Sequence, residues 1–369
     1  MEWQNIHCVR GFIVSLIILL ATATSLTADS KEASETGCLT SFFTKSLHYT
    51  GEGMRRWYEA DNGFMQITGI PYDQLNCKSC HVKSCDQCHL KKKRAKSVFK
   101  RSKAKDMNTC MPCHGREGLT FKFDGERGQL DVHVASGMVC ADCHRHYDVH
   151  GDGRFRSSMR DQKGVRADCR TCHIDSAGDS PEFDPDTESH SVHGTKLDCS
   201  ACHVQNTTAC YNCHFERYLE TGRKKGNYIP MQDWLLLINY NGQITSGSVM
   251  SLVYQNKKFL AYVPYFTHSV TAAGRQCEDC HANPAVRAMQ QGKKVKVVDF
   301  KKGKTITWKG VVPVADGKLD WVFLNRTDSG WEKIESADEP TVQYAAYGRP
   351  LTDEQMHALY EEQRIADSK

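Results

Sequence analysis

The sequence predicts a mainly α-helical and irregular fold, with short helices and with β-hairpins confined to the C-terminal third. Three observations lead to this prediction. One short cysteine–histidine motif recurs eight times, the mean hydropathy is −0.55, and long apolar runs are scarce after the N-terminus. A chain of 369 residues with this composition lacks the apolar material for an ordinary layered core. We therefore expect bound groups to supply much of the interior.

The recurring motif is C-x-x-C-H, and it uses 16 of the 18 cysteines. Its copies are Cys77-Cys80-His81, Cys85-Cys88-His89, Cys110-Cys113-His114, Cys140-Cys143-His144, Cys169-Cys172-His173, Cys199-Cys202-His203, Cys210-Cys213-His214 and Cys277-Cys280-His281. Zinc ribbons, thioredoxin-like dithiols and disulfide frameworks do not require His after the second Cys. C-x-x-C-H is the attachment signature of haem c, whose iron takes the adjacent His as an axial ligand. The sequence therefore predicts a multihaem cytochrome c fold organised around eight covalently attached haem c groups.

The N-terminus predicts export. Residues 1–28 form a signal peptide with Arg10 before the apolar stretch Phe12–Ala21, and cleavage is expected after Ala23 or Ala28. Retention of the segment as a membrane anchor is the alternative. Because haem c is attached outside the bacterial inner membrane, we expect a periplasmic, extracellular or cell-surface protein. Cys38 is the thiol left over, and it is either inert or paired between subunits.

The haem motifs divide the chain. Residues 29–76 form an N-terminal segment, and residues 77–214 form a seven-haem domain. Four attachment cysteines recur at intervals of about thirty residues, which predicts one haem per supersecondary unit. The step from His81 to Cys85 spans no more than about 14 Å even when extended, so the first two haems must be neighbours.

The pattern of apolar and polar residues changes after His214, from helix-like to strand-like. Residues 215–290 are expected to hold a β-hairpin insertion and the eighth haem, with strands in Leu235–Phe266, a turn at Asn241-Gly242 and a looser one at Gln255–Lys258. Residues 291–350 are expected to be β-rich, with hairpins in Lys294–Val314 and Lys318–Ile334. Residues 351–369 predict a C-terminal helix with Thr352 as N-cap and Gln355 in the capping box.

The sixth ligand of each iron decides between electron transfer and catalysis. Apart from His7 and the motif residues, the chain has eight further histidines, namely His48, His133, His146, His150, His190, His193, His268 and His357. Eight candidates for eight irons predict bis-His ligation throughout, with the methionines as rival ligands. His133, His193 and His268 lie just before a motif, and we expect each to reach a neighbouring haem rather than its own.

Charge sets limits on partners. The formal charge is +4, but eight oxidised haems with ionised propionates would bring it to about −4. A nucleic-acid partner is therefore not expected. The basic run Lys91–Lys105 either docks an acidic redox partner or is a solvated stretch that partly neutralises propionates. The acidic stretch Asp179–Glu188 offers carboxylates to Ca²⁺ or is a solvated loop, because it lacks the EF-hand pattern.

At these motifs, and in the stretches HVASGMVCADCHRHYDVHGDG and HSVTAAGRQCEDCH, the chain resembles the multihaem c-type cytochromes of metal-reducing and sulfur-metabolising bacteria. The resemblance covers roughly residues 77–290, and tetrathionate-reductase-like octahaem cytochromes are the nearest enzyme group. It implies a secreted electron carrier in anaerobic respiration or extracellular electron transfer, with quinol-linked or outer-membrane cytochromes as partners. The alternative is an octahaem reductase of a sulfur or nitrogen oxyanion with one haem that is not bis-His. The C-x-x-C-K motif of some nitrite reductases is absent.

Two of the spare histidines suggest a further partner. His48 and His357 lie near the ends of the chain. Either could bind a haem in the next copy and so drive self-assembly. An integral membrane protein is not expected unless the signal is retained.

Overall fold

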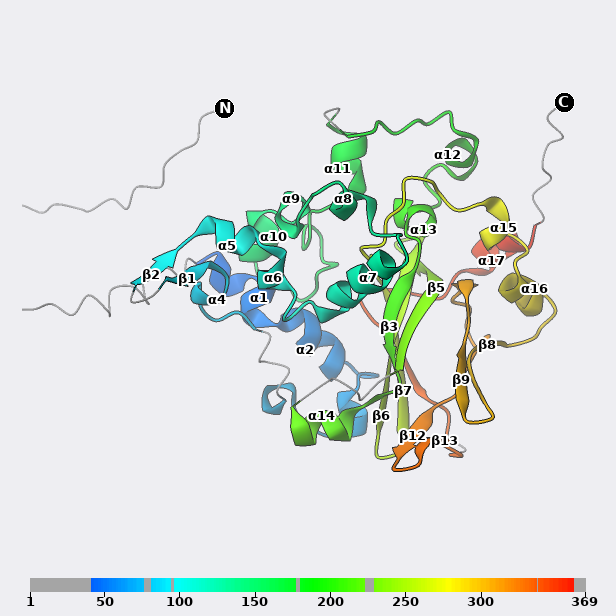
Figure 1. The fold of residues 1–369 in the computed structure, drawn as a ribbon. Coiled ribbons are helices and arrows are strands. Elements are labelled where there is room, and N and C mark those ends of the chain that lie inside the picture. The colour runs from blue at the N-terminus through cyan, green and yellow to red at the C-terminus, as the bar shows by residue number, and fades with distance from the viewer. Residues whose placement is uncertain are drawn as a thin grey trace, which may run out of the picture. The chain divides into compact units, whose positions relative to one another are not determined.

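The computed structural model describes residues 41–75, 81–93, 96–176, 180–222, 229–336 and 338–361 (Figure 1). The expected signal peptide, Cys38, Cys77, Cys80 and Asp179 lie outside these residues. Among the described residues, no helix is both long and apolar enough to cross a membrane.

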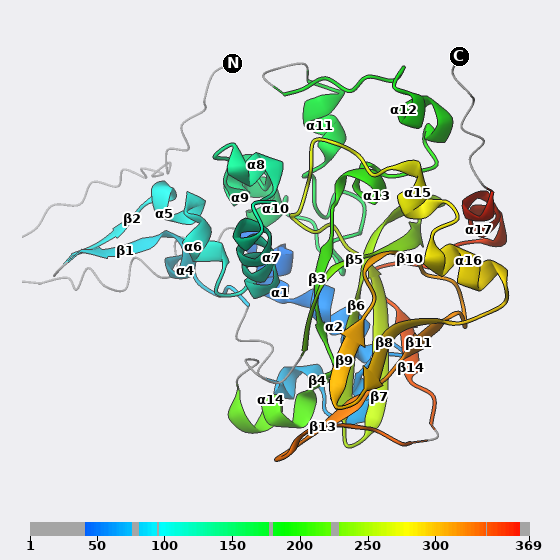
Figure 2. The same cartoon turned by 45° about the vertical axis from the view of Figure 1, so that its right-hand side comes forward.

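The expectation of a mainly helical and irregular fold is wrong. Short helices carry most of the motifs in the first half, but the second half is built on a seven-stranded sheet, and smaller sheets accompany it (Figures 1 and 2). The physical reason is that the segment after His214 contains enough apolar residues to form a conventional core of its own. The prediction that bound groups must replace that core does not apply to this half.

The helices are short, mostly of one to two turns. They are η1 (Phe43–Lys45), α1 (Leu47–Thr50), α2 (Glu52–Glu59), α3 (Met65–Thr68), η2 (Tyr72–Gln74), α4 (Asp86–His89), α5 (Arg101–Lys105), α6 (Met107–Cys110), α7 (Gly115–Glu126), α8 (Val132–Ala135), α9 (Cys140–Cys143), α10 (His146–His150), α11 (Cys169–His173), α12 (Glu188–His193), α13 (Cys199–His203), α14 (Phe215–Thr221), α15 (Cys277–Cys280), α16 (Pro284–Gln290) and α17 (Asp353–Tyr360). Helices this short are not stable alone, so their stability depends on packing.

The large sheet has the strand order β10-β5-β6-β7-β14, with β3 paired to β5 and β4 paired to β6. Its strands are β3 (Thr207–Tyr211), β4 (Cys213–His214), β5 (Ile229–Tyr240), β6 (Gln243–Tyr254), β7 (Lys257–Pro264), β10 (Gly310–Pro313) and β14 (Thr341–Tyr344). The other strands are β1 (Leu90–Lys93), β2 (Lys96–Phe99), β8 (Val295–Lys301), β9 (Lys304–Thr307), β11 (Leu319–Trp321), β12 (Leu324–Thr327) and β13 (Gly330–Lys333). They form the pairs β1-β2 and β12-β13 and the three-stranded sheet β11-β8-β9.

The core of the second half is aromatic and aliphatic. Trp234, Leu235, Leu236 and Ile238 of β5 are almost completely buried, so this strand is covered on both faces. Trp321 Nε1 donates a hydrogen bond of 2.7 Å to the Tyr262 hydroxyl within the core. The sheet is therefore a rigid base for two motifs, because β3 is one of its strands and α13 packs against β6.

The hairpin turns agree in part with the sequence. Asn241 and Gly242 have φ of 51° and 85° and join β5 to β6 in a two-residue turn, as predicted. The second turn is also tight rather than loose, because Gln255 and Asn256 both adopt positive φ. The hairpins expected in Lys294–Val314 and Lys318–Ile334 are present as β8–β9 and β12–β13, while β11 pairs in parallel with β8. α17 begins where the capping box predicts, with the Thr352 side chain accepting from Gln355 N at 3.2 Å.

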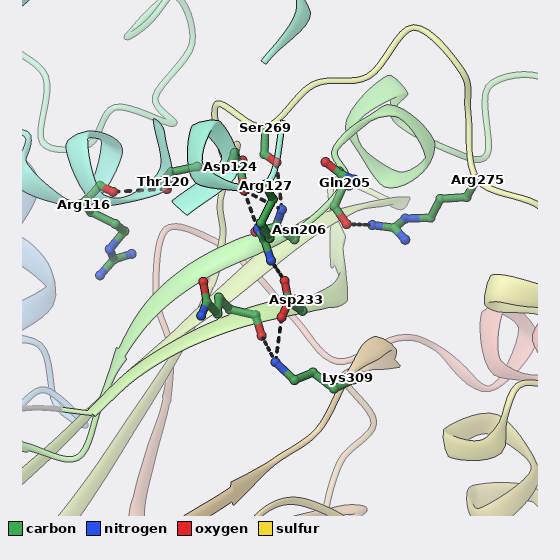
Figure 3. Close-up of polar contacts among 11 residues, drawn as sticks. Arg116, Thr120, Asp124, Arg127, Gln205, Asn206, Asp233, Ser269, Arg275 and Lys309 are labelled. Atoms are coloured by element: carbon green, nitrogen blue, oxygen red, sulfur yellow. Dashed lines mark hydrogen bonds and ion pairs between the residues drawn. The ribbon is translucent and has the colours of Figure 1, made fainter. Parts of the chain in front are cut away.

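A buried polar network ties α7 to the sheet (Figure 3). Asp124 is fully buried, and its Oδ1 accepts from Arg127 Nη2 at 2.6 Å and from Asn206 Nδ2 at 3.1 Å. Asn206 Nδ2 also donates to Ser269 Oγ at 3.0 Å. Arg127 continues the network to Asp233 on β5, which Lys309 Nζ reaches at 2.8 Å. This network holds α7 and the loop around Ser269 in fixed positions.

We expect Asp124→Ala to lower the free energy of unfolding by about 2–3 kcal/mol, because it leaves Asn206 and Arg127 without their buried acceptor. Glu126→Ala on the same helix is the matched control. Its carboxylate lies 3.9 Å from Lys122 Nζ on the surface, so the expected loss is below about 0.5 kcal/mol. Guanidinium unfolding followed by far-ultraviolet circular dichroism measures both. Equal losses for the two variants would contradict this assignment.

Candidate functional site

Six of the eight motifs lie in or beside a short helix: α4, α6, α9, α11, α13 and α15. On a helix, residues at i, i+3 and i+4 share a face, so both cysteines and the histidine of a motif can point toward one ligand. Acidic residues begin these helices. Asp168 and Asp198 cap α11 and α13, and Asp142 Oδ2 accepts from Val139 N at 2.8 Å at the start of α9.

Each of these six motifs brings its His opposite a histidine from another segment. The ring-centre distances are 6.0 Å for His89–His150, 6.2 Å for His114–His48, 6.2 Å for His144–His268, 6.1 Å for His173–His133, 6.3 Å for His203–His190 and 6.1 Å for His281–His193. Every pair joins one motif histidine to one histidine outside the motifs.

The common distance has a simple physical meaning. A metal–imidazole nitrogen bond is about 2.0 Å long, and the ring centre lies roughly 1 Å behind the nitrogen. Two imidazoles on opposite sides of one metal therefore have centres about 6 Å apart. The ring-centre distances of the six pairs match this value.

Hydrogen bonds fix the orientation of the rings. Nδ1 has an acceptor in His268 (Glu117 Oε2, 2.8 Å), His173 (Pro181 O, 2.7 Å), His190 (Asp184 O, 2.6 Å), His193 (Ser189 O, 2.7 Å), His203 (Thr271 O, 3.1 Å) and His133 (Asp131 Oδ1, 3.3 Å). A ring that donates from Nδ1 presents Nε2 with its lone pair free. This is the tautomer that a metal-binding histidine needs, and such outer partners are typical of metal-ligating histidines.

One of these hydrogen-bond acceptors, Asp131, also has a structural role. Asp131 accepts from His133 Nδ1, and its Oδ2 accepts from Val270 N at 2.9 Å. It therefore links one paired histidine to the loop that carries another, His268.

Burial lowers the pKa of His268, but the Glu117 carboxylate outweighs burial, so this pKa is raised overall. Burial lowers the pKa of His48 to about 4, which favours the neutral form.

Neighbouring motifs follow one another in a continuous series. A hydrogen bond with Cys140, then burial and the nearby Cys88, raise the pKa of Cys110. A hydrogen bond with Cys199 has the same effect on Cys169, while burial and then Cys172 raise the pKa of Cys143. Burial raises the pKa of Cys202, and the Cys277 thiol adds to it. The six motifs are thus neighbours in chain order, from Cys85–His89 to Cys277–His281.

His81 has no second histidine opposite it among the described residues. Its Nε2 lies 3.0 Å from the Tyr72 hydroxyl, and the two rings are stacked with centres 5.9 Å apart. Gly51, at φ 70°, lies against the same Nε2 edge of the ring, where a Cβ would collide with Nε2 and Cε1. The surroundings of this motif therefore differ from those of the six pairs.

The motif Cys210–His214 lies in strands rather than in a helix. Cys210 belongs to β3 and Cys213 to β4, with Asn212 between them at φ 58°. The His214 ring is buried, and Nε2 donates to Leu324 O at 2.8 Å. In this fold His214 does not present a free Nε2. The residues of the Cys210–His214 motif therefore do not fit a porphyrin in the way that the six pairs do.

Two further histidines considered as distal ligands stay apart from the motif rings. His146 packs against Tyr147, and His357 lies on the exposed face of α17 with Nε2 3.5 Å from Glu361. Sequence reasoning also missed Glu117, Asp131 and Tyr72. The first two are ordinary acidic residues near a motif, and no spacing signal marks their role.

On the expectation that each pair holds a haem, we expect His48→Ala to convert one low-spin site into a high-spin one, because it removes the partner of His114. His357→Ala, the matched control near the other terminus, should leave the spectrum unchanged. Resonance Raman of the purified protein distinguishes the two states. His48 has its partner within its own chain, so neither change should alter the mass measured by light scattering. A spectral change in His357→Ala alone would contradict the pairing.

Comparison with protein-family models, with curated proteins and with solved structures yields no match. In the parts of the chain that the structure describes, no three His, Cys, Asp or Glu side chains gather as a metal site. The arrangement consists of facing histidine pairs beside cysteine pairs. Calcium binding at residues 179–188 remains a prediction.

Proposed function

We propose that this protein is an exported multihaem c-type cytochrome that carries electrons along a series of bis-His haems in anaerobic respiration or extracellular electron transfer. The observation that carries the proposal is the set of six histidine pairs with ring centres 6.0–6.3 Å apart, each beside a C-x-x-C motif. Haem c supplies reversible one-electron redox chemistry when bound.

The proposal gives the cysteines and histidines of the motifs, and the partner histidines, the following roles. The motif cysteines would form the thioethers, and the motif histidines and their partners would be the axial ligands. Each pair would supply both axial ligands, which favours electron transfer over substrate binding. The series of neighbouring motifs, in contact through Cys110–Cys140 and Cys169–Cys199, supports a continuous path. Electron donor and acceptor would be redox proteins of the respiratory chain.

A second function has its own supporting observation. In the described chain His81 Nε2 lies 3.0 Å from the Tyr72 hydroxyl and no second histidine faces this ring, so a haem held here would lack the histidine pair that the other six have. A haem of this kind would suit an octahaem reductase of a sulfur or nitrogen oxyanion. The Cys210–His214 motif has no role in this second function, because the His214 ring is hydrogen-bonded within the sheet.

Intact mass and electron paramagnetic resonance of the purified mature protein test the proposal. We expect eight haems of about 0.6 kDa each, as the motifs predict, and six bis-His low-spin signals. Five or fewer covalent haems would reject the carrier. Tight carbon monoxide binding to one reduced haem would favour the reductase.

A further inference from the structure

An exposed basic surface is formed by the described residues of an arm within 90–105. It contains the β1–β2 hairpin and α5, and both views show the hairpin projecting from the body on the side away from the large sheet (Figures 1 and 2). Between Lys91 and Lys105 the sequence has nine basic residues and no acidic one. This surface, the basic arm, is not needed for the pairing of the histidines.

The basic arm combines charge with exposed apolar side chains. Lys91 is paired in register with Val98, and Leu90 with Phe99. Val98 and Phe99 are 44% and 47% exposed, and all four β2 side chains face solvent. Cross-strand partners share a face of the ribbon, so Lys91 and Val98 point to the same side. Val98 and Phe99 are consecutive in β2 and therefore point to opposite faces of the ribbon, so each face presents one exposed apolar side chain beside lysines. Apolar contact flanked by charge is typical of protein interfaces.

The basic arm is fixed to one haem motif. β1 begins directly after His89, and Lys100 N donates to His89 O at 2.8 Å. Lys103 Nζ donates to Gln87 O at 2.9 Å inside the same motif. This motif is the first member of the series of six that ends at Cys277–His281. A partner bound to the arm would thus lie beside the end of the series.

We propose that the basic arm docks an acidic redox protein, so that electrons enter or leave at the Cys85–Cys88–His89 motif; this inference rests on the proposed function. The exchange would be a single-electron transfer between the partner's redox centre and the haem that Cys85, Cys88 and His89 would hold, with no bond made or broken. Complementary charge steers such encounters and raises their rate by one to three orders of magnitude at low salt. Adjacency to the end of the histidine series favours a redox protein over a lipid surface.

Binding of a plant-type [2Fe–2S] ferredoxin, a strongly acidic one-electron protein, tests the proposal on the haem-loaded protein. We expect the triple change Lys91→Glu, Lys92→Glu and Lys96→Glu to raise the Kd at least about tenfold at low ionic strength. The wild-type Kd should rise steeply with salt, whereas that of the variant should not. The rate of haem reduction by the reduced ferredoxin should fall in parallel.

The matched control is Lys294→Glu, Lys302→Glu and Lys304→Glu. These three lysines are also exposed, and they lie on or beside the β8–β9 hairpin. Their replacement changes the net charge by the same amount as the replacement of the three arm lysines. We expect less than a twofold change in Kd for the control. Equal weakening in both variants would reduce the effect to net charge and overturn the proposal.

Two other outcomes would also overturn it. One is an unchanged Kd in the arm variant. The other is loss of binding to phosphatidylglycerol vesicles with ferredoxin binding intact, which would assign the arm to a lipid surface. Haem content measured as the pyridine haemochrome separates this proposal from the proposed function. A protein without covalent haem contradicts the function, whereas a fully loaded protein with unaltered binding contradicts only the docking.

Discussion

Replacement of His268 by Met should raise the midpoint potential of one haem and leave the others nearly unchanged. The His268 ring lies 6.2 Å from that of His144, and its Nδ1 donates to the Glu117 carboxylate. A thioether ligand in place of imidazole stabilises ferrous iron relative to ferric iron, and axial ligands set haem potentials over a range of about 0.8 V. A spectroelectrochemical titration of the purified protein resolves the shift.

Two further variants sharpen this test. Glu117→Gln keeps the ligand but removes the negative charge behind it, so we expect a smaller rise in the same potential. His146→Met is the matched control, because the His146 ring contacts Tyr147 and none of the motif rings in the described chain. A shift of equal size in His146→Met would show that the pairing is wrong.

Removal of the two attachment cysteines should distinguish two motifs that are close in sequence. We expect Cys199→Ser with Cys202→Ser to lower the intact mass by one haem, about 0.6 kDa, and to abolish one bis-His signal. The motif at Cys210 and Cys213 predicts the same loss of mass for the corresponding serine pair. Its strand geometry and the bond from His214 to Leu324 predict that all six bis-His signals survive.

The two measurements are independent. An unchanged mass in the Cys210→Ser and Cys213→Ser variant would show that no haem is attached there, and the motif count would then overstate the number of haems. Loss of a bis-His signal in that variant would instead show that His214 leaves the sheet in the holoprotein. Either result is read from the mass and the electron paramagnetic resonance spectrum of the same sample.

The motifs could be recognised from the sequence because their chemistry depends on local spacing. The pairing of His114 with His48, or of His144 with His268, could not be, because each partner comes from a distant segment and tertiary structure decides which rings meet. The number of spare histidines suggested eight pairs, whereas the structure brings six of them to motif rings.

The fold class was mispredicted for a related reason. The C-x-x-C-H motifs favour short helices, whereas the β-branched and aromatic residues around Cys210 favour a strand. Thr207 and Tyr211 of β3 are fully buried against the sheet, and this packing outweighs the helical habit of the motif. The turns at Asn241-Gly242 and the cap at Thr352 were predictable, because both depend on local chemistry.

The histidine pairs also act on the topology of the chain. Each iron would join two distant segments as a cross-link does, and the links are interleaved. The link from His48 to His114 overlaps the one from His89 to His150, and that from His144 to His268 overlaps the one from His193 to His281. Opening any one loop therefore leaves its residues held by another link. A protease that nicks one exposed loop between His48 and His281 would therefore release no fragment from the haem-loaded protein, because at least one link spans every point of this stretch.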